Sequence, residues 1–251
     1  MKDTKNNSLR NKTRRRNKYK YRGGTIKDDT IFTRITKLNH KIYGNIYTFG
    51  DNDGISSHIK NGGIWEEKLS QTIAKYYLPG TDMLDIGANI GLNSLRADQI
   101  NKITGTCHLF EPQSDVFLLL NLNTQSLNRK LYNMALSDSY SILTYTQDIN
   151  NIGSTTLKDN NMTNNNISVL SCNLDSLKFD NKISLIKIDI EDNEIKLLNG
   201  GLSTIKQHMP TIIVESGPEN YQTVEKILLD LGYIMLEKIA THDYLFTKKD
   251  L

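Results

Sequence analysis

The segment from Met83 to Gly91 constrains the fold of this chain more than any other. An apolar run carries a carboxylate, Asp85, near its end, and it leads into a turn flanked by Gly87 and Gly91 before a helical pattern begins. Glycine is favoured at such a turn because a side chain would keep a cofactor away from the backbone. The segment therefore predicts a buried strand, a nucleotide-type pocket and a helix, although a purely structural glycine-rich turn is the alternative.

The turn differs from a dinucleotide-binding fingerprint. That fingerprint requires G-x-G-x-x-G, whereas this chain has Asn89 and Leu92 where glycine is expected. Asn89 suits the same backbone because asparagine tolerates the left-handed conformation. A dinucleotide would also place its pyrophosphate at the helix N-terminus, whereas Asp85 suits a cationic ligand. We expect Asp85 to attract such a ligand or to order the loop.

The chain around this segment alternates strands and helices, which is typical of a parallel sheet covered by helices. Seven strands are expected at Met83–Ile86, Cys107–Phe110, Leu131–Leu136, Leu185–Ile188, Thr211–Val214, Tyr233–Leu236 and Tyr244–Phe246. Helices are expected at Leu92–Ile100, Ser114–Leu127, Asn193–Leu198 and Glu219–Leu231. The sequence thus predicts an α/β, Rossmann-like fold whose mostly parallel sheet has helices on both faces and whose last strand returns through a hairpin.

Three regions are expected along the chain. Residues 1–24 read as a disordered basic tail, because they contain almost no apolar residues to offset the ordering entropy. Residues 25–78 read as a β extension followed by a helix over Ile64–Tyr77, and residues 79–251 as the main domain. Within that domain, Tyr140–Asn166 reads as a polar, turn-prone insert between the third and fourth strands.

Charge and composition exclude several functional classes. The tail carries ten Lys and Arg residues, so residues 25–251 hold 21 basic and 27 acidic residues and are mildly acidic. Such a body is unlike a nucleic-acid-binding surface, which needs a basic groove to neutralise phosphates. No apolar run is long enough for a membrane helix and no secretory signal is recognisable, so a soluble, intracellular protein is expected. The two cysteines and five histidines lack metal-ligand spacing, so no metal site is expected.

Acidic residues follow two further predicted strands. Glu111 lies 24 positions after Gly87, where a carboxylate can accept hydrogen bonds from both ribose hydroxyls of an adenosine. A helix-start glutamate favoured by the helix dipole is the alternative.

A carboxylate cluster, Asp189, Glu191 and Glu194, follows the fourth predicted strand, and Glu215 follows the fifth. Ligands of open α/β sheets bind at these strand ends, and crowded carboxylates raise one another's pKa, which makes a better base for a hydroxyl. Asp189 is the expected proton acceptor because it directly follows the strand, with Glu191 second and Glu215 third. Ordering of the loop and helix capping are the structural alternatives.

Six short motifs together resemble the FkbM family of methyltransferases over roughly residues 40–248. They are Asp85-Ile86-Gly87-Ala88-Asn89-Ile90-Gly91, Phe110-Glu111-Pro112, Met134-Ala135-Leu136-Ser137-Asp138, Leu174-Asp175-Ser176-Leu177, Ile188-Asp189-Ile190-Glu191 with Glu194, and Ile213-Val214-Glu215. The resemblance implies a class I methyltransferase fold with seven strands and S-adenosylmethionine as the donor. It also implies O-methylation of a sugar, a glycan or another small metabolite.

The resemblance also implies residue roles. Asp85, Gly87, Asn89 and Gly91 would lie at the methionine side of the donor, Glu111 at the ribose, and Ser137 with Asp138 at the adenine rim. This chain departs from the family at Asp192, where glycine is common. The extra charge motivates a second hypothesis, a methyltransferase-like binding or regulatory module without turnover. An oxidoreductase on a similar sheet is the third.

We predict that residues 1–24 are dispensable for chemistry, because they lack apolar anchors. Their removal should leave the melting temperature and the affinity for S-adenosylhomocysteine unchanged. A large loss of either would indicate that the tail docks on the domain.

Overall fold

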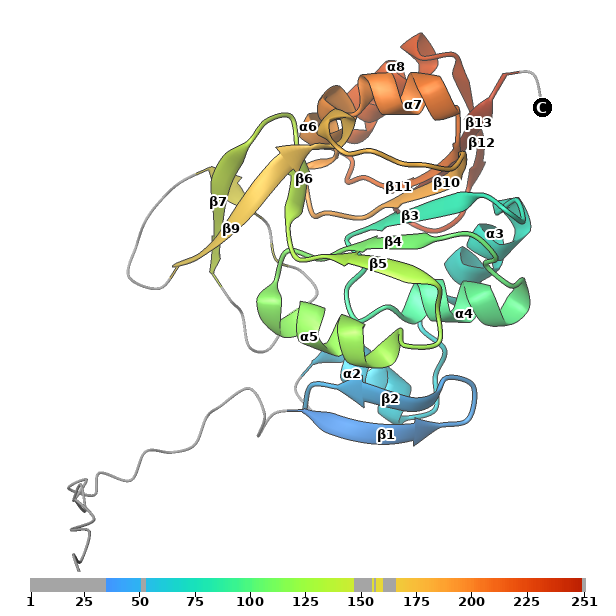
Figure 1. Cartoon of the computed structure of the whole chain (residues 1–251), viewed down its shortest axis with the longest axis vertical. Helices are drawn as coiled ribbons and strands as arrows, with labels where there is room; N and C mark the ends of the chain where they lie inside the picture. The colour runs from blue at the N-terminus through green and yellow to red at the C-terminus, as the bar shows by residue number, and fades with distance from the viewer. Residues whose placement is uncertain (1–34, 51–52, 147–154, 156, 160–165, 250–251) are drawn as a thin grey trace, which may run out of the picture.

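A seven-stranded sheet forms the centre of the computed structural model, which describes residues 35–50, 53–146, 155, 157–159 and 166–249. The expected tail, residues 1–24, lies outside the described residues. The strand order across the sheet is β12-β13-β11-β10-β3-β4-β5 (Figure 1). The strands are β3 (Asp82–Ile86), β4 (Cys107–Phe110), β5 (Arg129–Tyr132), β10 (Ile183–Ile188), β11 (Thr211–Glu215), β12 (Tyr233–Lys238) and β13 (Asp243–Lys248).

Strand directions confirm the expected topology. Strand β3 pairs in parallel with both β4 and β10, and the parallel pairing continues to β5 on one side and β11 on the other. Strand β13 runs antiparallel to β11 and to β12, so the last two strands form the expected hairpin. All parallel strands therefore end at the same edge of the sheet, where ligands of this fold class bind.

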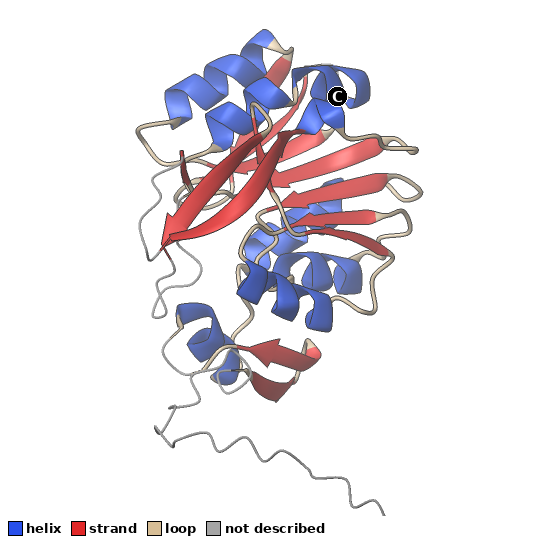
Figure 2. Ribbon diagram, turned by 60° about the vertical axis from the view of Figure 1, so that its left-hand side comes forward, coloured by secondary structure: helices blue, strands red, loops and turns tan. Residues whose placement is uncertain are grey.

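Helices cover both faces of the sheet, as expected (Figures 1 and 2). Alternate residues of each strand point to opposite faces, so Met83 and Leu84 of β3 belong to two separate hydrophobic cores. The helices of the first core are α3 (Glu67–Tyr76), α4 (Leu92–Ile100) and α5 (Ser114–Asn123). Those of the second core are α6 (Glu194–Gly200), α7 (Leu202–His208) and α8 (Tyr221–Asp230).

The expected third strand, Leu131–Leu136, is wrong as a single element. Strand β5 ends at Tyr132, and β6 (Ala135–Ser137) belongs to a different sheet. Asn133 lies between them and donates hydrogen bonds from its side chain to the backbone carbonyls of Glu111 and Pro112. The apolar run continues through the break, so hydrophobic pattern alone does not reveal it.

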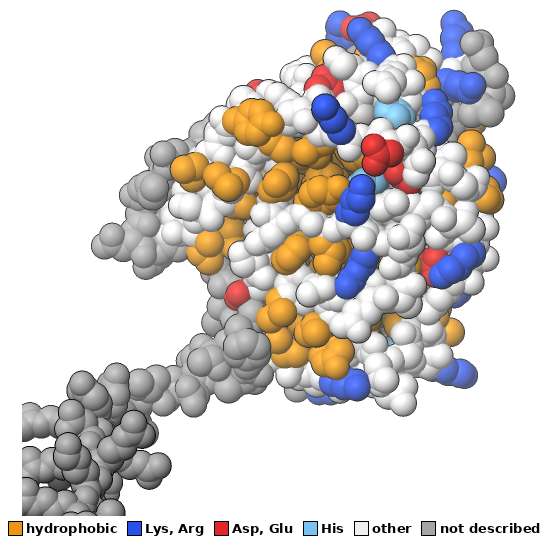
Figure 3. All heavy atoms as spheres, in the orientation of Figure 1, with side chains coloured by type: hydrophobic (Ala, Val, Ile, Leu, Met, Phe, Trp, Pro, Cys, Tyr) orange, Lys and Arg blue, Asp and Glu red, His pale blue; other side chains and the backbone are white. Residues whose placement is uncertain are grey.

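The insert between the third and fourth core strands was expected to form turns, but its described part also forms β-strands. Its described part forms, with β6, a four-stranded sheet in the order β6-β9-β7-β8. The additional strands are β7 (Ser141–Thr146), β8 (Lys158–Asp159) and β9 (Asn166–Asn173), and a short 3-10 turn, η1 (Leu174–Ser176), follows β9. Apolar side chains gather over this part of the molecule in Figure 3, and Tyr140, Ile142 and Leu170 are exposed there.

The N-terminal extension, expected as a β extension, forms a hairpin of β1 (Thr36–His40) and β2 (Gly44–Thr48). Helix α2 (Gly54–Lys60), which follows it, was not expected. Asn123 of α5 attaches this hairpin to the main domain: its side chain accepts a hydrogen bond from the Tyr47 N–H at 2.7 Å and donates one to the Tyr47 carbonyl at 2.9 Å. Buried residues of the extension share the first hydrophobic core, so the extension is held against the binding edge of the sheet.

Two other sequence expectations differ in detail. Helix α5 ends at Asn123 rather than at Leu127. Thr124 caps it, and the Thr124 hydroxyl donates a hydrogen bond to the Leu120 carbonyl. Helix α7 follows α6 and was not expected. No helix in the described part of the chain combines the length and the apolar character that a bilayer crossing needs.

A buried network at the far edge of the sheet predicts a stability effect. The Asp82 carboxylate accepts a hydrogen bond from the Thr106 N–H at 2.8 Å and lies 3.2 Å from His108 Nε2. Replacing Asp82 with Ala should lower the free energy of unfolding by about 1–3 kcal/mol, because the buried partners lose their acceptor. Thermal melting tests this, and unchanged S-adenosylhomocysteine affinity in the folded variant is the expected control result.

Candidate active site

Two adjoining cavities lie at the carboxyl ends of the parallel strands. The larger has a volume of ≈ 250 Å³ and the smaller one of ≈ 60 Å³. Both are lined by Gly87, Asn89, Asp189 and Glu191, so these residues form the junction between the two. A ligand that spans the junction would contact the loop after β3 and the loop after β10 at the same time.

The smaller cavity combines apolar walls with one buried carboxylate. Its walls include Phe110, Met134 and Leu136, and the Glu111 carboxylate lies among them. Glu111 accepts a hydrogen bond from the Asn89 N–H at 3.0 Å with one oxygen and from the Gln113 N–H at 2.8 Å with the other. Each carboxylate oxygen has a second lone pair, so Glu111 keeps the capacity to accept hydrogen bonds from a ribose diol.

Burial raises the pKa of the Glu111 carboxyl to about 7, although the hydrogen bonds from the two backbone N–H groups lower it. Hydroxyl donors from a ligand would stabilise the ionised form, so binding and ionisation of Glu111 are linked.

The glycine at position 87 is required by the protein itself. Gly87 has φ +79°, and a Cβ there would lie 1.7 Å from the Asp189 carbonyl oxygen. The tight contact is therefore with the backbone after β10, rather than only with a cofactor as the sequence suggested. Gly91 also has a positive φ and approaches Thr124, which caps the C-terminus of α5, and Gly91 lines neither cavity.

Asn89 takes the left-handed backbone that the sequence predicted, with φ +49°. Its side-chain oxygen accepts a hydrogen bond from the Ile90 N–H at 2.8 Å. The residue thereby fixes the turn and places its own N–H on Glu111.

Asp85 orders the loop and does not line either cavity. It is fully buried, and it accepts a hydrogen bond from the Ser94 hydroxyl at 2.6 Å. Its other oxygen lies 3.2 Å from the Lys187 ammonium. Of the two roles expected for Asp85, the structure favours the ordering one.

Lys187 is a site residue to which the sequence analysis gave no role. Its ammonium is buried and contacts the Gly87 carbonyl at 2.9 Å and the Asp189 carboxylate at 3.2 Å, besides Asp85. Burial alone would lower the pKa of Lys187, but Asp85, Asp189 and Glu66 outweigh it and hold that pKa above its usual range. The missed signal was a lysine at a fully apolar strand position, which requires buried partners.

Asp189 and Glu215 share a hydrogen bond across β10 and β11. Burial opposes ionisation of Asp189, but Lys187 and the hydrogen bond from Glu215 hold its pKa below the usual range. Burial, together with Asp189, raises the pKa of Glu215 to about 9. At neutral pH the pair therefore carries one proton, and that proton resides on Glu215.

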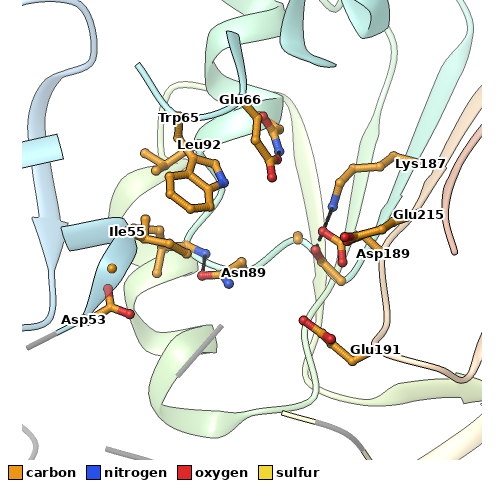
Figure 4. Close-up of a pocket in the computed structure, with 15 residues that line it drawn as sticks. Asp53, Ile55, Trp65, Glu66, Asn89, Leu92, Lys187, Asp189, Glu191 and Glu215 are labelled. Carbon is orange, nitrogen blue, oxygen red and sulfur yellow. Dashed lines mark hydrogen bonds and ion pairs between the residues drawn. The ribbon is translucent and has the colours of Figure 1, made fainter. Parts of the chain in front are cut away.

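Glu191 lies at the junction of the cavities with its carboxylate near the open space, as Figure 4 shows. Burial and the charges of Asp189 and Asp192 raise the pKa of Glu191 to about 7. Glu191 and Asp192 both have positive φ, at +50° and +74°. Two consecutive left-handed residues other than glycine store strain, which is typical of functional sites.

Other acidic residues that the sequence brought forward lie elsewhere. Glu194 is buried in α6, accepts a hydrogen bond from the Asp192 N–H at 3.1 Å and lines neither cavity. Ser137 and Asp138 do not line the smaller cavity either, because the chain leaves that wall after Leu136. Met134, Ala135 and Leu136, which precede them, do line that cavity.

The extension completes the larger cavity. Asp53, Ile55, Trp65 and Glu66 form the wall that faces the strand ends (Figure 4). Sequence analysis assigned these four residues no role, since nothing local indicates that this segment folds over the sheet. Despite the crowded carboxylates, no grouping of three or more His, Cys, Asp or Glu side chains in the described part of the chain is suited to hold a metal ion.

Comparison with known proteins agrees with this geometry. A family model described as the methyltransferase FkbM domain matches residues 85–235, which is more than half of the chain. The chain belongs to the FkbM methyltransferase family. The matched region contains the loop after β3, Glu111, and the strand ends that carry Asp189 and Glu215.

Solved structures show low similarity to the chain. The methyltransferase FkbM from Methylobacillus flagellatus shares 15% identity with a TM-score of 0.48, over 68% of this chain and 44% of that protein, so the chain spans less than half of its length. The TehB-like methyltransferase from Corynebacterium glutamicum shares 11% identity with a TM-score of 0.44, over 78% of this chain and 94% of that protein. No curated protein sequence matches the chain. The family assignment rests on the sequence match.

Membership of this family implies S-adenosylmethionine as the methyl donor. The site fits that donor: Glu111 is buried beside an apolar slot, and the junction at Gly87 and Asn89 leads into an acidic cavity that suits cationic groups. The smaller cavity would hold the adenosine, and the junction would lie beside the methionine part.

The pKa of Glu111 predicts a pH dependence of donor binding. The ionised carboxylate accepts hydrogen bonds from the ribose hydroxyls, so affinity for S-adenosylhomocysteine should rise as pH increases through about 7. Below about pH 7, each pH unit should weaken binding by up to about tenfold. Calorimetry across this range tests the idea, and Glu111→Gln should bind weakly with little pH dependence between about pH 6 and about pH 8. An unchanged slope in that variant would assign the titration to another group.

Proposed function

We propose that the chain is an S-adenosylmethionine-dependent O-methyltransferase that acts on a hydroxyl of a sugar, a glycan or another small metabolite. The observation that carries the proposal is the junction between the cavities, where the donor loop meets Glu191 beside a cavity of ≈ 250 Å³. When bound, the donor supplies an electrophilic methyl group. The chain then has to orient an acceptor oxygen at the junction and remove its proton.

Glu191 is the better candidate for the general base. Its pKa of about 7 is matched to a base that works near neutral pH. Asp189 is occupied, because one of its oxygens pairs with Lys187 and its carboxylate also accepts a hydrogen bond from protonated Glu215. This reverses the order expected from the sequence, in which Asp189 came first.

Asp189 and Glu215 then have a supporting role. Protonated Glu215 holds Asp189 in place, and ionised Asp189 keeps Lys187 on the Gly87 carbonyl. The negative charge of Asp189 also raises the pKa of Glu191. A carboxylate with a raised pKa is a stronger proton acceptor when it is ionised.

An active enzyme is better supported than an inactive binding module. Asp192 motivated the second hypothesis because glycine is common at that position in the family. Its backbone has φ +74°, which glycine adopts readily and aspartate tolerates. Its side chain lines neither cavity and lies 3.4 Å from the Asn220 amide. Asp192 therefore does not occupy either cavity, and it acts on the site through its charge, which helps to raise the pKa of Glu191.

We predict that Glu191→Gln lowers kcat by about a hundredfold or more, the usual size of a general-base contribution. The affinity for S-adenosylhomocysteine should change little, because the substitution keeps the shape of the side chain. Transfer of a labelled methyl group to a panel of hydroxyl acceptors measures the effect.

Glu194→Gln is the matched control, because Glu194 has a similarly raised pKa but lines neither cavity. It should retain turnover. Near-normal turnover in Glu191→Gln together with a collapse in Asp189→Asn would return the role of base to Asp189. Tight binding of S-adenosylhomocysteine without transfer to any acceptor would favour the binding module.

A further inference from the structure

One wall of the larger cavity comes from outside the part of the chain that matches the family. The family match begins at residue 85, whereas Asp53, Ile55, Trp65 and Glu66 belong to the extension before it. These residues face the strand ends that carry Asp189 and Glu191 (Figure 4). The wall therefore comes from a segment that lies outside the family match.

Trp65 is held in place by its own loop. It is the single tryptophan of the chain, and the His58 ring packs edge-on against it with centroids 5.7 Å apart. His58 is fixed in turn, because its Nε2 lies 3.1 Å from the Ile64 carbonyl and its own carbonyl accepts the Gly63 N–H. Ile55 and Leu92 lie beside the indole in Figure 4, so this corner of the cavity is apolar.

Glu66 adds a polar group directly beside this apolar corner. Its backbone is left-handed, with φ +43°, and its carboxylate accepts a hydrogen bond from the Asn93 amide at 2.7 Å. Asn93 is itself fixed by the Ser70 hydroxyl at 2.9 Å. A glutamate with a strained backbone, held on a cavity wall by one buried partner that is itself fixed, is typical of a binding residue.

We propose that Trp65 and Glu66 form the acceptor-binding element of this chain, in which the indole stacks on the apolar face of a sugar ring and the Glu66 carboxylate accepts hydrogen bonds from its hydroxyls. The inference rests on the proposed function and names the residues that select the acceptor.

The surroundings favour a neutral ring with several hydroxyls. An aromatic face binds an apolar ring face, and carboxylates form strong hydrogen bonds with hydroxyl donors. An anionic acceptor is disfavoured, because among the described residues Lys187 is the only cation that lines the cavity, and it is already paired with Asp85 and Asp189. Asp53, on the same wall, adds a further carboxylate.

The single tryptophan provides a direct test. Fluorescence of the full chain, saturated with S-adenosylhomocysteine, is titrated with methyl pyranosides of glucose, mannose and galactose. At least one should change the Trp65 emission saturably. Sorbitol, which has the hydroxyls without the ring, and glucose 6-phosphate, which adds negative charge, should have little effect.

Variants separate acceptor binding from donor binding. Trp65→Ala should raise the acceptor KM by about tenfold, equivalent to about 1.4 kcal/mol, and Trp65→Phe should raise it less because a ring remains. Glu66→Gln should also raise the acceptor KM. Glu67→Gln is the matched control, because the neighbouring Glu67 pairs with Arg96 and does not line the cavity. Affinity for S-adenosylhomocysteine should stay within about twofold in all four folded variants.

Several results would overturn the inference. Emission that responds equally to sorbitol, or to no sugar, removes the stacking role of Trp65. A loss of S-adenosylhomocysteine affinity in Trp65→Phe or Glu66→Gln would assign that residue to the donor instead. If the unmodified chain does not bind S-adenosylhomocysteine at all, the proposed function itself fails, and the calorimetric titration distinguishes this case.

Discussion

The buried ammonium of Lys187 is the interaction on which the rest of the site depends. It contacts the Gly87 carbonyl in the donor loop, Asp85 under that loop and Asp189 at the end of the neighbouring strand. Removing a charge from water is costly, so such a group persists only where its partners surround it. The donor loop and the carboxylates on the acceptor side are thereby held in one geometry by a single side chain.

The same cation decides where the protons of the site lie. It keeps Asp189 ionised, and Asp189 in turn holds a proton on Glu215. Glu191, which is farther along the loop, is left with a pKa of about 7. Carboxylates of the same chemical type thus acquire different charges because each one has different partners.

The two halves of the site have different origins. The donor side is built from the region that matches the family, in which parallel strands bring Gly87 and Glu111 to one edge of the sheet. The larger cavity is closed by the extension, which Asn123 attaches to α5 through the Tyr47 backbone, and the proposed acceptor site lies there. A shared donor pocket with a separate acceptor wall allows acceptor selection to vary without changes at the donor.

The sequence by itself determined the class of fold and the donor turn. The strand and helix alternation, the left-handed Asn89 and the strand-end acids depend on local patterns, which residues close in the chain set by themselves. Tertiary structure alone decided that Asp189 pairs with Lys187 whereas Glu191 lies at the junction of the cavities, and that Trp65 faces the strand ends. Those outcomes depend on the charges of Lys187 and Glu215 and on packing between segments that are far apart in the chain. Burial and charge at such contacts leave no local pattern in the sequence.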